Sequence, residues 1–189
     1  MVQKEINLIT NNWWSEKRKE VNIGLTKELK YSTPHQTTSI IKIVVNSGVG
    51  GAINDKKKLE NIVEIIQHIT KQKPIITKAH KSIINFNLRE GMKIGCKVTL
   101  RHKRAWDFLF DLINIYLPQM PNFLGFSPKK FDRNGNYNFG INRLDIFPTI
   151  DYNLISAKQG LQITIVFSSS SIEENIKFLK YIDFPLLDK

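Results

Sequence analysis

Alternation of apolar and polar residues predicts a sheet in this chain, and its clearest strand spans residues 94–101. Successive side chains of a strand point to opposite faces, so this strand is expected to have one apolar and one polar face. The polar face is predicted to carry Lys97, Thr99 and Arg101. A β-branched strand is predicted over residues 40–46, with Asn46 on its more polar side. Further strands are expected at residues 75–76, 143–147 and 161–167.

Apolar residues at helical spacing predict three helices after residue 50. The first follows Asn54 or Asp55, either of which can cap it. Its buried stripe is expected to comprise Leu59, Ile62, Val63, Ile66 and Ile69. A strongly apolar helix is predicted over residues 104–117, ending at Pro118. The last helix is assigned a capping box, Ser171 with Glu174, and the apolar residues Ile176, Leu179 and Ile182.

The first part of the chain differs from the rest. Residues 1–39 predict a helical appendage whose pattern is interrupted by Gly24 and ended by Pro34. Residues 40–189 predict a single α+β domain, a mainly antiparallel sheet with helices packed on one face. Within it, residues 118–140 are rich in Pro, Gly, Asn, Phe and Lys and are expected to form a long surface excursion.

The charge balance points to a class of partner. Lysine and arginine number 28 against 17 acidic residues, a formal net charge of +11. Such an excess is typical of proteins that meet polyanions, so nucleic acid is the first candidate and an anionic membrane surface the second. A merely basic globular protein is the alternative. No stretch is long and apolar enough to span a bilayer, and no membrane partner is expected.

The cellular compartment is suggested only by composition. Cys96 is the single cysteine, which excludes an intramolecular disulfide and fits a reducing compartment. The N-terminal residues lack an apolar signal core and the bias of a transit peptide. We therefore expect a protein made where it works, or one whose presequence has been removed. Heavy use of Lys, Ile and Asn hints at the AT-rich genome of an organelle or a small bacterium.

Candidate enzyme chemistry is sparse. Gly48-x-Gly50 follows a strand and precedes a helix, but Ile53 stands where a dinucleotide fingerprint needs its third glycine. A turn glycine, or an RNA phosphate at the helix N-terminus, explains the same residues. The histidines form no cluster of the kind that binds metal, and no pair of carboxylates suggests acid–base catalysis. No enzymatic activity, metal or cofactor is predicted.

A basic segment over residues 71–91 favours RNA. Its cations alternate with groups that stack or hydrogen-bond, among them Phe86 and Asn87. Recognition of RNA loops uses such a mixture of phosphate contacts and aromatic stacking. From composition alone, a solvated loop is an equal alternative.

Seven sequence blocks lie between residue 40 and the C-terminus. They are Lys42 to Ala52 (KIVVNSGVGGA), Gln72 to Ser82 (QKPIITKAHKS), Arg89 to Arg101 (REGMKIGCKVTLR), Phe131 to Gly140 (FDRNGNYNFG), Ile146 to Tyr152 (IFPTIDY), Gly160 to Thr164 (GLQIT) and Asp183-Phe184-Pro185. In this order and spacing they resemble the universal large-subunit ribosomal protein five family, in its bacterial and organellar form. Residues 1–39 match only loosely.

The resemblance implies a structural protein of the central protuberance of the large ribosomal subunit, acting in translation as a monomer within the ribosome. The implied partners are 5S rRNA, large-subunit rRNA, P-site tRNA, neighbouring central-protuberance proteins and the small-subunit head protein thirteen. The residues expected to bind 5S rRNA are Asn46, Gln72, Thr99 and Arg101, joined by Lys97 on the same predicted face. The residues expected in a tRNA-facing loop, about 78–91, are Lys78, His80, Lys81, Ser82, Phe86 and Arg89, with His80 replacing a typical arginine.

The resemblance also implies a bridge to the small-subunit head through residues 118–123 and 147–152. An RNA-binding or RNA-chaperone module outside the ribosome, built on the same fold, is the alternative function. An organellar ribosome is the expected location, with the mitochondrion favoured over a plastid or the bacterial cytoplasm.

Overall fold

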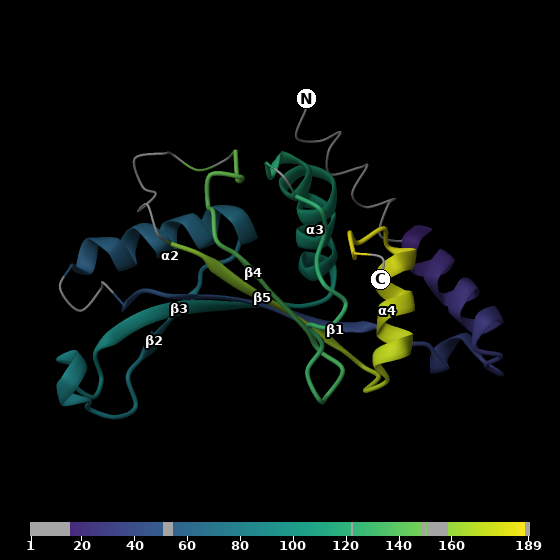
Figure 1. The fold of residues 1–189 in the computed structure, drawn as a ribbon, viewed down its shortest axis with the longest axis horizontal. Coiled ribbons are helices and arrows are strands. Elements are labelled where there is room, and N and C mark those ends of the chain that lie inside the picture. The colour runs from purple at the N-terminus through teal and green to yellow at the C-terminus, as the bar shows by residue number, and fades with distance from the viewer. Residues whose placement is uncertain (1–15, 51–54, 122, 149, 151–158, 188–189) are drawn as a thin grey trace. The chain divides into compact units, whose positions relative to one another are not determined.

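The computed structural model describes residues 16–50, 55–121, 123–148, 150 and 159–187. Five strands form an antiparallel sheet in the order β2-β3-β1-β5-β4 (Figure 1). These strands are β1 (Ile40–Gly48), β2 (Ile75–Lys78), β3 (Lys93–Leu100), β4 (Tyr137–Ile141) and β5 (Leu161–Phe167). The helices packed against the sheet are α2 (Lys56–Thr70), α3 (Lys103–Asp111), α4 (Ile172–Tyr181) and a helix over residues 16–28. The α+β prediction is confirmed.

The described residues group into two compact units. One comprises residues 44–100 and 139–164, and the other comprises residues 16–43, 101–138 and 165–187. Strands β1, β4 and β5 contribute residues to both units. The expected division at residue 39, between an appendage and a single domain, stays a prediction. None of the helices in the described ranges is long and apolar enough to cross a membrane.

In the unit of residues 44–100 and 139–164, α2 runs along β3 (Figure 1). The Asp55 side chain caps α2 as predicted, accepting a hydrogen bond from the Lys57 backbone N–H at 3.0 Å. The aliphatic residues that α2 buries are Leu59, Ile62, Ile65, Ile66 and Ile69. The sequence analysis was wrong in placing Val63 rather than Ile65 in this stripe. Val63 is half-buried because it borders a groove described below.

In the other unit, α4 is the centre of packing. Trp106 of α3 approaches Phe178 of α4 with ring centroids 6.2 Å apart, and Phe167 of β5 meets the same ring at 5.5 Å. The helix over residues 16–28 lies beside α4 (Figure 1) and continues through Gly24, which the sequence analysis expected to interrupt it. A Cβ atom at Gly24 would lie 2.5 Å from the ring of Tyr181. Glycine at position 24 therefore allows the helix over residues 16–28 to lie close to Tyr181 of α4.

A hairpin over residues 131–137 packs against α4 in the same unit. Its turn is organised by Asp132, whose carboxylate accepts hydrogen bonds from the backbone N–H groups of Asn134 and Asn136 and from the Asn136 amide, at 2.8–2.9 Å. Burial alone would raise the pKa of the Asp132 carboxyl. The hydrogen bonds outweigh this effect, and together they hold the pKa below its ordinary value of 3.8. Gly135, at φ +77°, completes the turn.

Three local predictions are wrong. Residues 143–147 lie in an irregular segment with turns, not in a strand. The strand is instead β4, which begins at Tyr137, within the expected excursion of residues 118–140. Leu144, Ile146 and Phe147 belong to this irregular segment, and their side chains are buried. Their apolar spacing therefore resembled the alternation of a strand. The helix expected over residues 104–117 is α-helical only to Asp111. It continues as a π-helix, Leu112–Tyr116, and a 3-10 turn, Leu117–Gln119, that includes Pro118.

The predicted capping box at α4 is also wrong. Ser171 is the N-cap residue, but its side chain makes no capping hydrogen bond, and Glu174 is buried. Asn175 takes over the organising role. Its fully buried amide accepts a hydrogen bond from the Thr38 hydroxyl at 2.7 Å and donates to the carbonyls of Gly135 and Ser169, both at 2.9 Å.

Candidate nucleic-acid interface

Strand β3 presents a polar face opposite its buried face. Cys96, Val98 and Leu100 are buried, whereas Lys97 is exposed and Thr99 is half-buried. The alternation predicted for this strand is confirmed. Strand β2 is antiparallel to β3 and pairs Ile75 with Lys97, so beside Lys97 the outermost strand of the sheet presents an exposed apolar side chain.

Gln72 is brought next to β3 by the end of α2. The helix ends at Lys71, whose left-handed φ of 54° turns the chain toward β2. The Gln72 amide then donates a hydrogen bond to the Thr99 carbonyl at 3.2 Å. Two predicted RNA-binding residues, 27 positions apart in sequence, therefore meet in space. The bond holds the Gln72 side chain against β3.

Asn46 belongs to β1, the strand beside β3. Its position is fixed by the residue that follows it. The buried Ser47 hydroxyl donates to the Gly160 carbonyl at 2.9 Å and accepts from the Gln159 amide at 2.8 Å. On the other side, a Cβ atom at Gly95 of β3 would lie 2.7 Å from the Ser47 carbonyl oxygen. β1 and β3 thus leave no room for a side chain at Gly95, beside the residue that follows Asn46, and Asn46 itself is half-buried.

Arg101 directly follows β3 and is exposed. It belongs to the unit of residues 101–138, whereas the other four predicted 5S-binding residues belong to the unit of residues 44–100. Arg101 is the first of four consecutive exposed basic residues, which end in the first turn of α3. The sequence analysis named Arg101 but not the three residues that follow it. These three are His102, Lys103 and Arg104. Their adjacency in sequence was the available signal.

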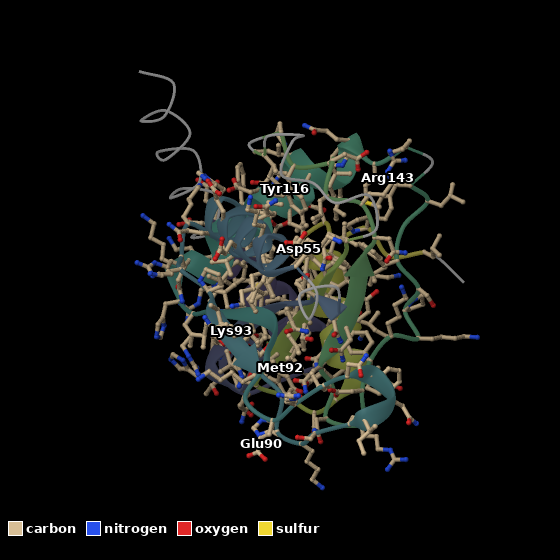
Figure 2. The ribbon with its side chains drawn as sticks, turned by 90° about the vertical axis from the view of Figure 1, so that its left-hand side faces the viewer. Asp55, Glu90, Met92, Lys93, Tyr116 and Arg143 are labelled. Atoms are coloured by element: carbon tan, nitrogen blue, oxygen red, sulfur yellow. The ribbon has the colours of Figure 1, made fainter. Side chains whose placement is uncertain are left out.

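Residues 78–91 form a hairpin extension, here called the finger. Its base is closed by hydrogen bonds from Ala79 N–H to the Met92 carbonyl at 2.8 Å and from Gly91 N–H to the Ala79 carbonyl at 2.9 Å. Higher up, Ile83 bridges to Leu88. Figure 2 labels Glu90, near the end of the finger, and Met92 and Lys93, which follow it at the start of β3. The finger is therefore a hairpin with a bridged stem, although it was expected only as a loop.

The predicted tRNA-facing residues all lie at the finger surface. Lys78, His80, Lys81, Ser82, Phe86 and Arg89 are exposed. The Ser82 hydroxyl also accepts a hydrogen bond from the Glu90 backbone N–H at 2.9 Å, so it stabilises the finger itself. The tip, a 3-10 turn over Ile84–Phe86, exposes Ile84 by 91% and Phe86 by 69%. The sequence analysis did not name Ile84 as a candidate contact residue. An isoleucine within a basic segment could have identified it.

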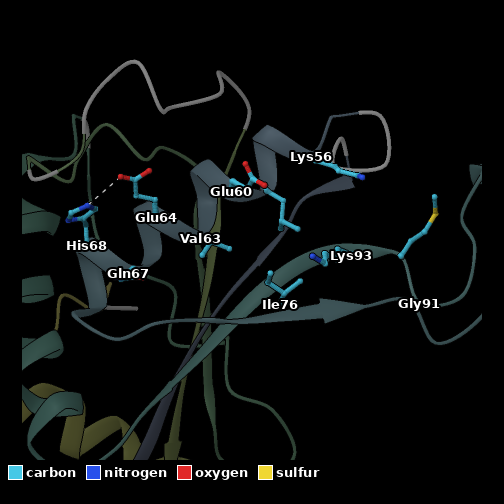
Figure 3. A pocket seen from close by; sticks show the side chains of 11 residues that line it. Lys56, Glu60, Val63, Glu64, Gln67, His68, Ile76, Gly91 and Lys93 are labelled. Carbon is cyan, nitrogen blue, oxygen red and sulfur yellow. Dashed lines mark ion pairs between the residues drawn. The ribbon is translucent and has the colours of Figure 1, made fainter.

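A groove of about 570 Å³ opens on the α2 side of the sheet (Figure 3). Leu59 and Val63 of α2 and Ile76 of β2 form the apolar wall of the groove. Ile76 pairs with the buried Cys96, so the groove lies on the face of the sheet opposite Lys97. Its rim includes two carboxylates, Glu60 and Glu64. Glu64 forms an ion pair with His68 at 3.8 Å. Lys56 and Lys93 also line the groove, so its charges are mixed and it lacks the continuous positive charge that an RNA backbone favours.

Other candidate chemistry receives no support. Burial raises the pKa of the Cys96 thiol to about 11, as befits a core residue. Among the residues that the structure describes, no three His, Cys, Asp or Glu side chains gather into a metal site. The Gly48-x-Gly50 turn lies in an antiparallel sheet, whereas a dinucleotide fingerprint belongs to a parallel one. Asn54 and Ile53 lie outside the described residues.

The chain is similar to known ribosomal proteins over most of its length. Residues 33–89 match the family model described as Ribosomal protein L5, and residues 93–186 match the model of the C-terminus of the same ribosomal family. Over 168 residues the chain is 46% identical to the "Large ribosomal subunit protein uL5" of Nocardia farcinica (strain IFM 10152), covering 89% of this chain and 90% of that protein. The chain therefore belongs to the ribosomal protein L5 (uL5) family, and it is a structural component of the large ribosomal subunit, not an enzyme.

Proposed function

We propose that the polar face of β3 and its flanking residues bind 5S rRNA in the central protuberance. The observation that carries this proposal is the bond between Gln72 and Thr99, which joins two predicted contact residues beside the exposed Lys97. A sheet face with cations and fixed amide or hydroxyl groups suits a nucleic-acid backbone. Lys97 and Arg101 supply the salt-dependent attraction. Asn46, Gln72 and Thr99 set the position of the RNA on the sheet.

We propose a second contact for the finger, with P-site tRNA. It carries Lys78, Lys81 and Arg89 on an ordered hairpin and exposes an aromatic ring at its tip. A hairpin extension projects cations without disturbing the sheet. The identity of the ligand rests on family membership, which places the chain in the large subunit.

A bridge to protein thirteen of the small-subunit head completes the proposal, together with contacts to large-subunit rRNA and to neighbouring proteins. Its expected surfaces are residues 118–123 and 147–152. Residues 122, 149, 151 and 152 lie outside the described residues. The chain would act as a monomer within the ribosome.

The 5S contact is tested by filter binding of the full chain to 5S rRNA over a range of salt concentrations. Arg101→Ala is expected to weaken binding and to lower the slope of log affinity against log salt by about one unit. Lys58→Ala, an exposed lysine on α2, is the matched control. Equal losses in the two variants would show that affinity reflects diffuse charge rather than the β3 face.

The alternative is an RNA-binding or RNA-chaperone module outside the ribosome. Sedimentation of large subunits washed in high salt separates the two functions, because a resident subunit protein stays with washed subunits. We further propose an organellar ribosome, with the mitochondrion first and a plastid or bacterial cytoplasm next; this rests on composition, and the relative named above is bacterial. Detection of the chain in ribosomes from purified mitochondria would support that location, and its restriction to another compartment would refute it.

A further inference from the structure

A second cavity, of about 540 Å³, lies between the finger tip and the turn that follows β1. Phe86, Asn87 and Leu88 line it from the finger, while Gly48 and Gly50 line it from the turn. All belong to one compact unit. The volume falls within the range of small-ligand sites, about 300–1,000 Å³.

The lining offers both surfaces that a nucleobase needs. The Phe86 ring is 69% exposed and provides a stacking platform. Asn87, held at φ 51° at the end of the tip turn, is exposed, and in the described part of the chain its amide has no hydrogen-bond partner. An amide donates and accepts at once, as the edge of a base requires.

The opposite wall is open. Among the described residues, a Cβ atom at Gly48 or Gly50 would meet nothing within 4 Å. None of the lining residues is acidic, in contrast to the groove on the α2 side. Lys81 and Arg89, both exposed, flank the tip in sequence and attract the phosphates on either side of a base.

We infer that this cavity receives one unstacked RNA base, which stacks on Phe86 and is hydrogen-bonded by Asn87. The inference rests on the proposed function and adds to it: the finger reads a base as well as binding phosphates. An unstacked base occurs in single-stranded loops of 5S rRNA and of tRNA alike. The chemistry of the cavity is the same for both sources, and the experiment separates them.

The experiment is an abasic scan. Each nucleotide in the single-stranded loops of a 5S rRNA transcript, and separately of a tRNA transcript, is replaced by an abasic site. Binding to the full chain is compared with binding to Phe86→Ala. One position is expected to weaken binding of the unaltered chain about 5- to 150-fold, the range found for a stacked base. The same abasic site should cost Phe86→Ala nothing further, and the RNA that contains it identifies the source.

Two further variants test the stacking itself. Phe86→Tyr should keep the effect of the abasic site, whereas Phe86→Leu, which keeps apolar bulk without an aromatic face, should lose most of it. Ile23→Ala is the control, since Ile23 is an exposed apolar residue of the other unit. If every abasic site costs the unaltered chain and Phe86→Ala equally while both RNAs still bind, the base pocket is refuted and the proposed function stands. If the unaltered chain binds neither RNA, the proposed function fails.

Discussion

The buried amide of Asn175 makes the sharpest stability prediction. Its three hydrogen bonds tie α4 to Thr38, to Gly135 in the 131–137 hairpin and to Ser169. Replacement by alanine removes all three bonds and leaves one hydroxyl and two carbonyls without the partner that the amide provided. Thr38 is 1% exposed and Asn175 is fully buried, so water does not reach the Thr38–Asn175 contact without local opening.

The expected loss follows from these contacts. Each buried hydrogen bond contributes about 1 kcal/mol net, and an orphaned buried group costs about 1–3 kcal/mol. Alanine's higher helix propensity offsets about 0.5 kcal/mol. Asn175→Ala should therefore lower the free energy of unfolding by about 3 kcal/mol. For a chain of this size that corresponds to a fall in melting temperature of about 6–12 °C.

Urea unfolding followed by circular dichroism measures the effect, with two comparison variants. Asn114→Ala removes an exposed amide that donates one hydrogen bond, to the Phe110 carbonyl, and should cost little. Asn175→Asp keeps the acceptor for Thr38 but turns a carboxylate oxygen toward two carbonyls, so it should destabilise at least as much as alanine. An Asn175→Ala loss no larger than that of Asn114→Ala would refute the reasoning, as would an Asn175→Asp variant of normal stability.

Three further predictions concern packing, pH and the finger. Gly24→Ala should destabilise by about 1–3 kcal/mol, because the added methyl group overlaps the Tyr181 ring; in a Tyr181→Ala background, thermal unfolding should show the same change to be neutral or stabilising. The hydrogen bonds to Asp132 hold its folded-state pKa below 3.8, so their contribution is present above that pH and is lost as the pH falls through the folded pKa. Unfolding below about pH 4 should therefore be less pH-dependent in Asp132→Asn, and an unchanged dependence would contradict this assignment. Ser82→Ala should speed hydrogen exchange at the Glu90 amide without moving the melting temperature, because that bond is exposed; unaltered exchange would mean that the hydroxyl does not order the finger.

The sequence analysis succeeded where a feature is determined by residues within a single strand or helix. The faces of β3 and the Asp55 cap of α2 follow from local periodicity and local hydrogen bonding, and both are confirmed. The analysis failed where the structure depends on contacts between residues that are far apart in the sequence. Strand β4 was missed because the buried residues Leu144, Ile146 and Phe147 imitate a strand although they lie in an irregular segment with turns. Asn175 was overlooked because its partners are 6 to 137 residues away and no pattern announces them.

The same holds for the candidate site. Lys97 and Thr99 could be placed on a polar face from alternation alone. The bond from Gln72 to Thr99 could not, since it depends on how the chain turns after α2. Likewise, the close approach of Ser47 to Gly95 depends on which strands become neighbours. The base cavity required the finger to be ordered, whereas its sequence was equally consistent with a solvated loop.

The strand order has a consequence for synthesis on the ribosome. β1 lies between β3 and β5, and the backbone bond from Ser168 to Ser39 joins residues 129 positions apart. β2 and β3 are complete once residue 100 has been added, whereas β5 follows only after residue 160. During that interval one edge of the aliphatic strand β1 has no partner, and such edges promote aggregation. Folding of this protein should therefore be limited by late closure of its central strand pair, and most sensitive to chaperones at that stage.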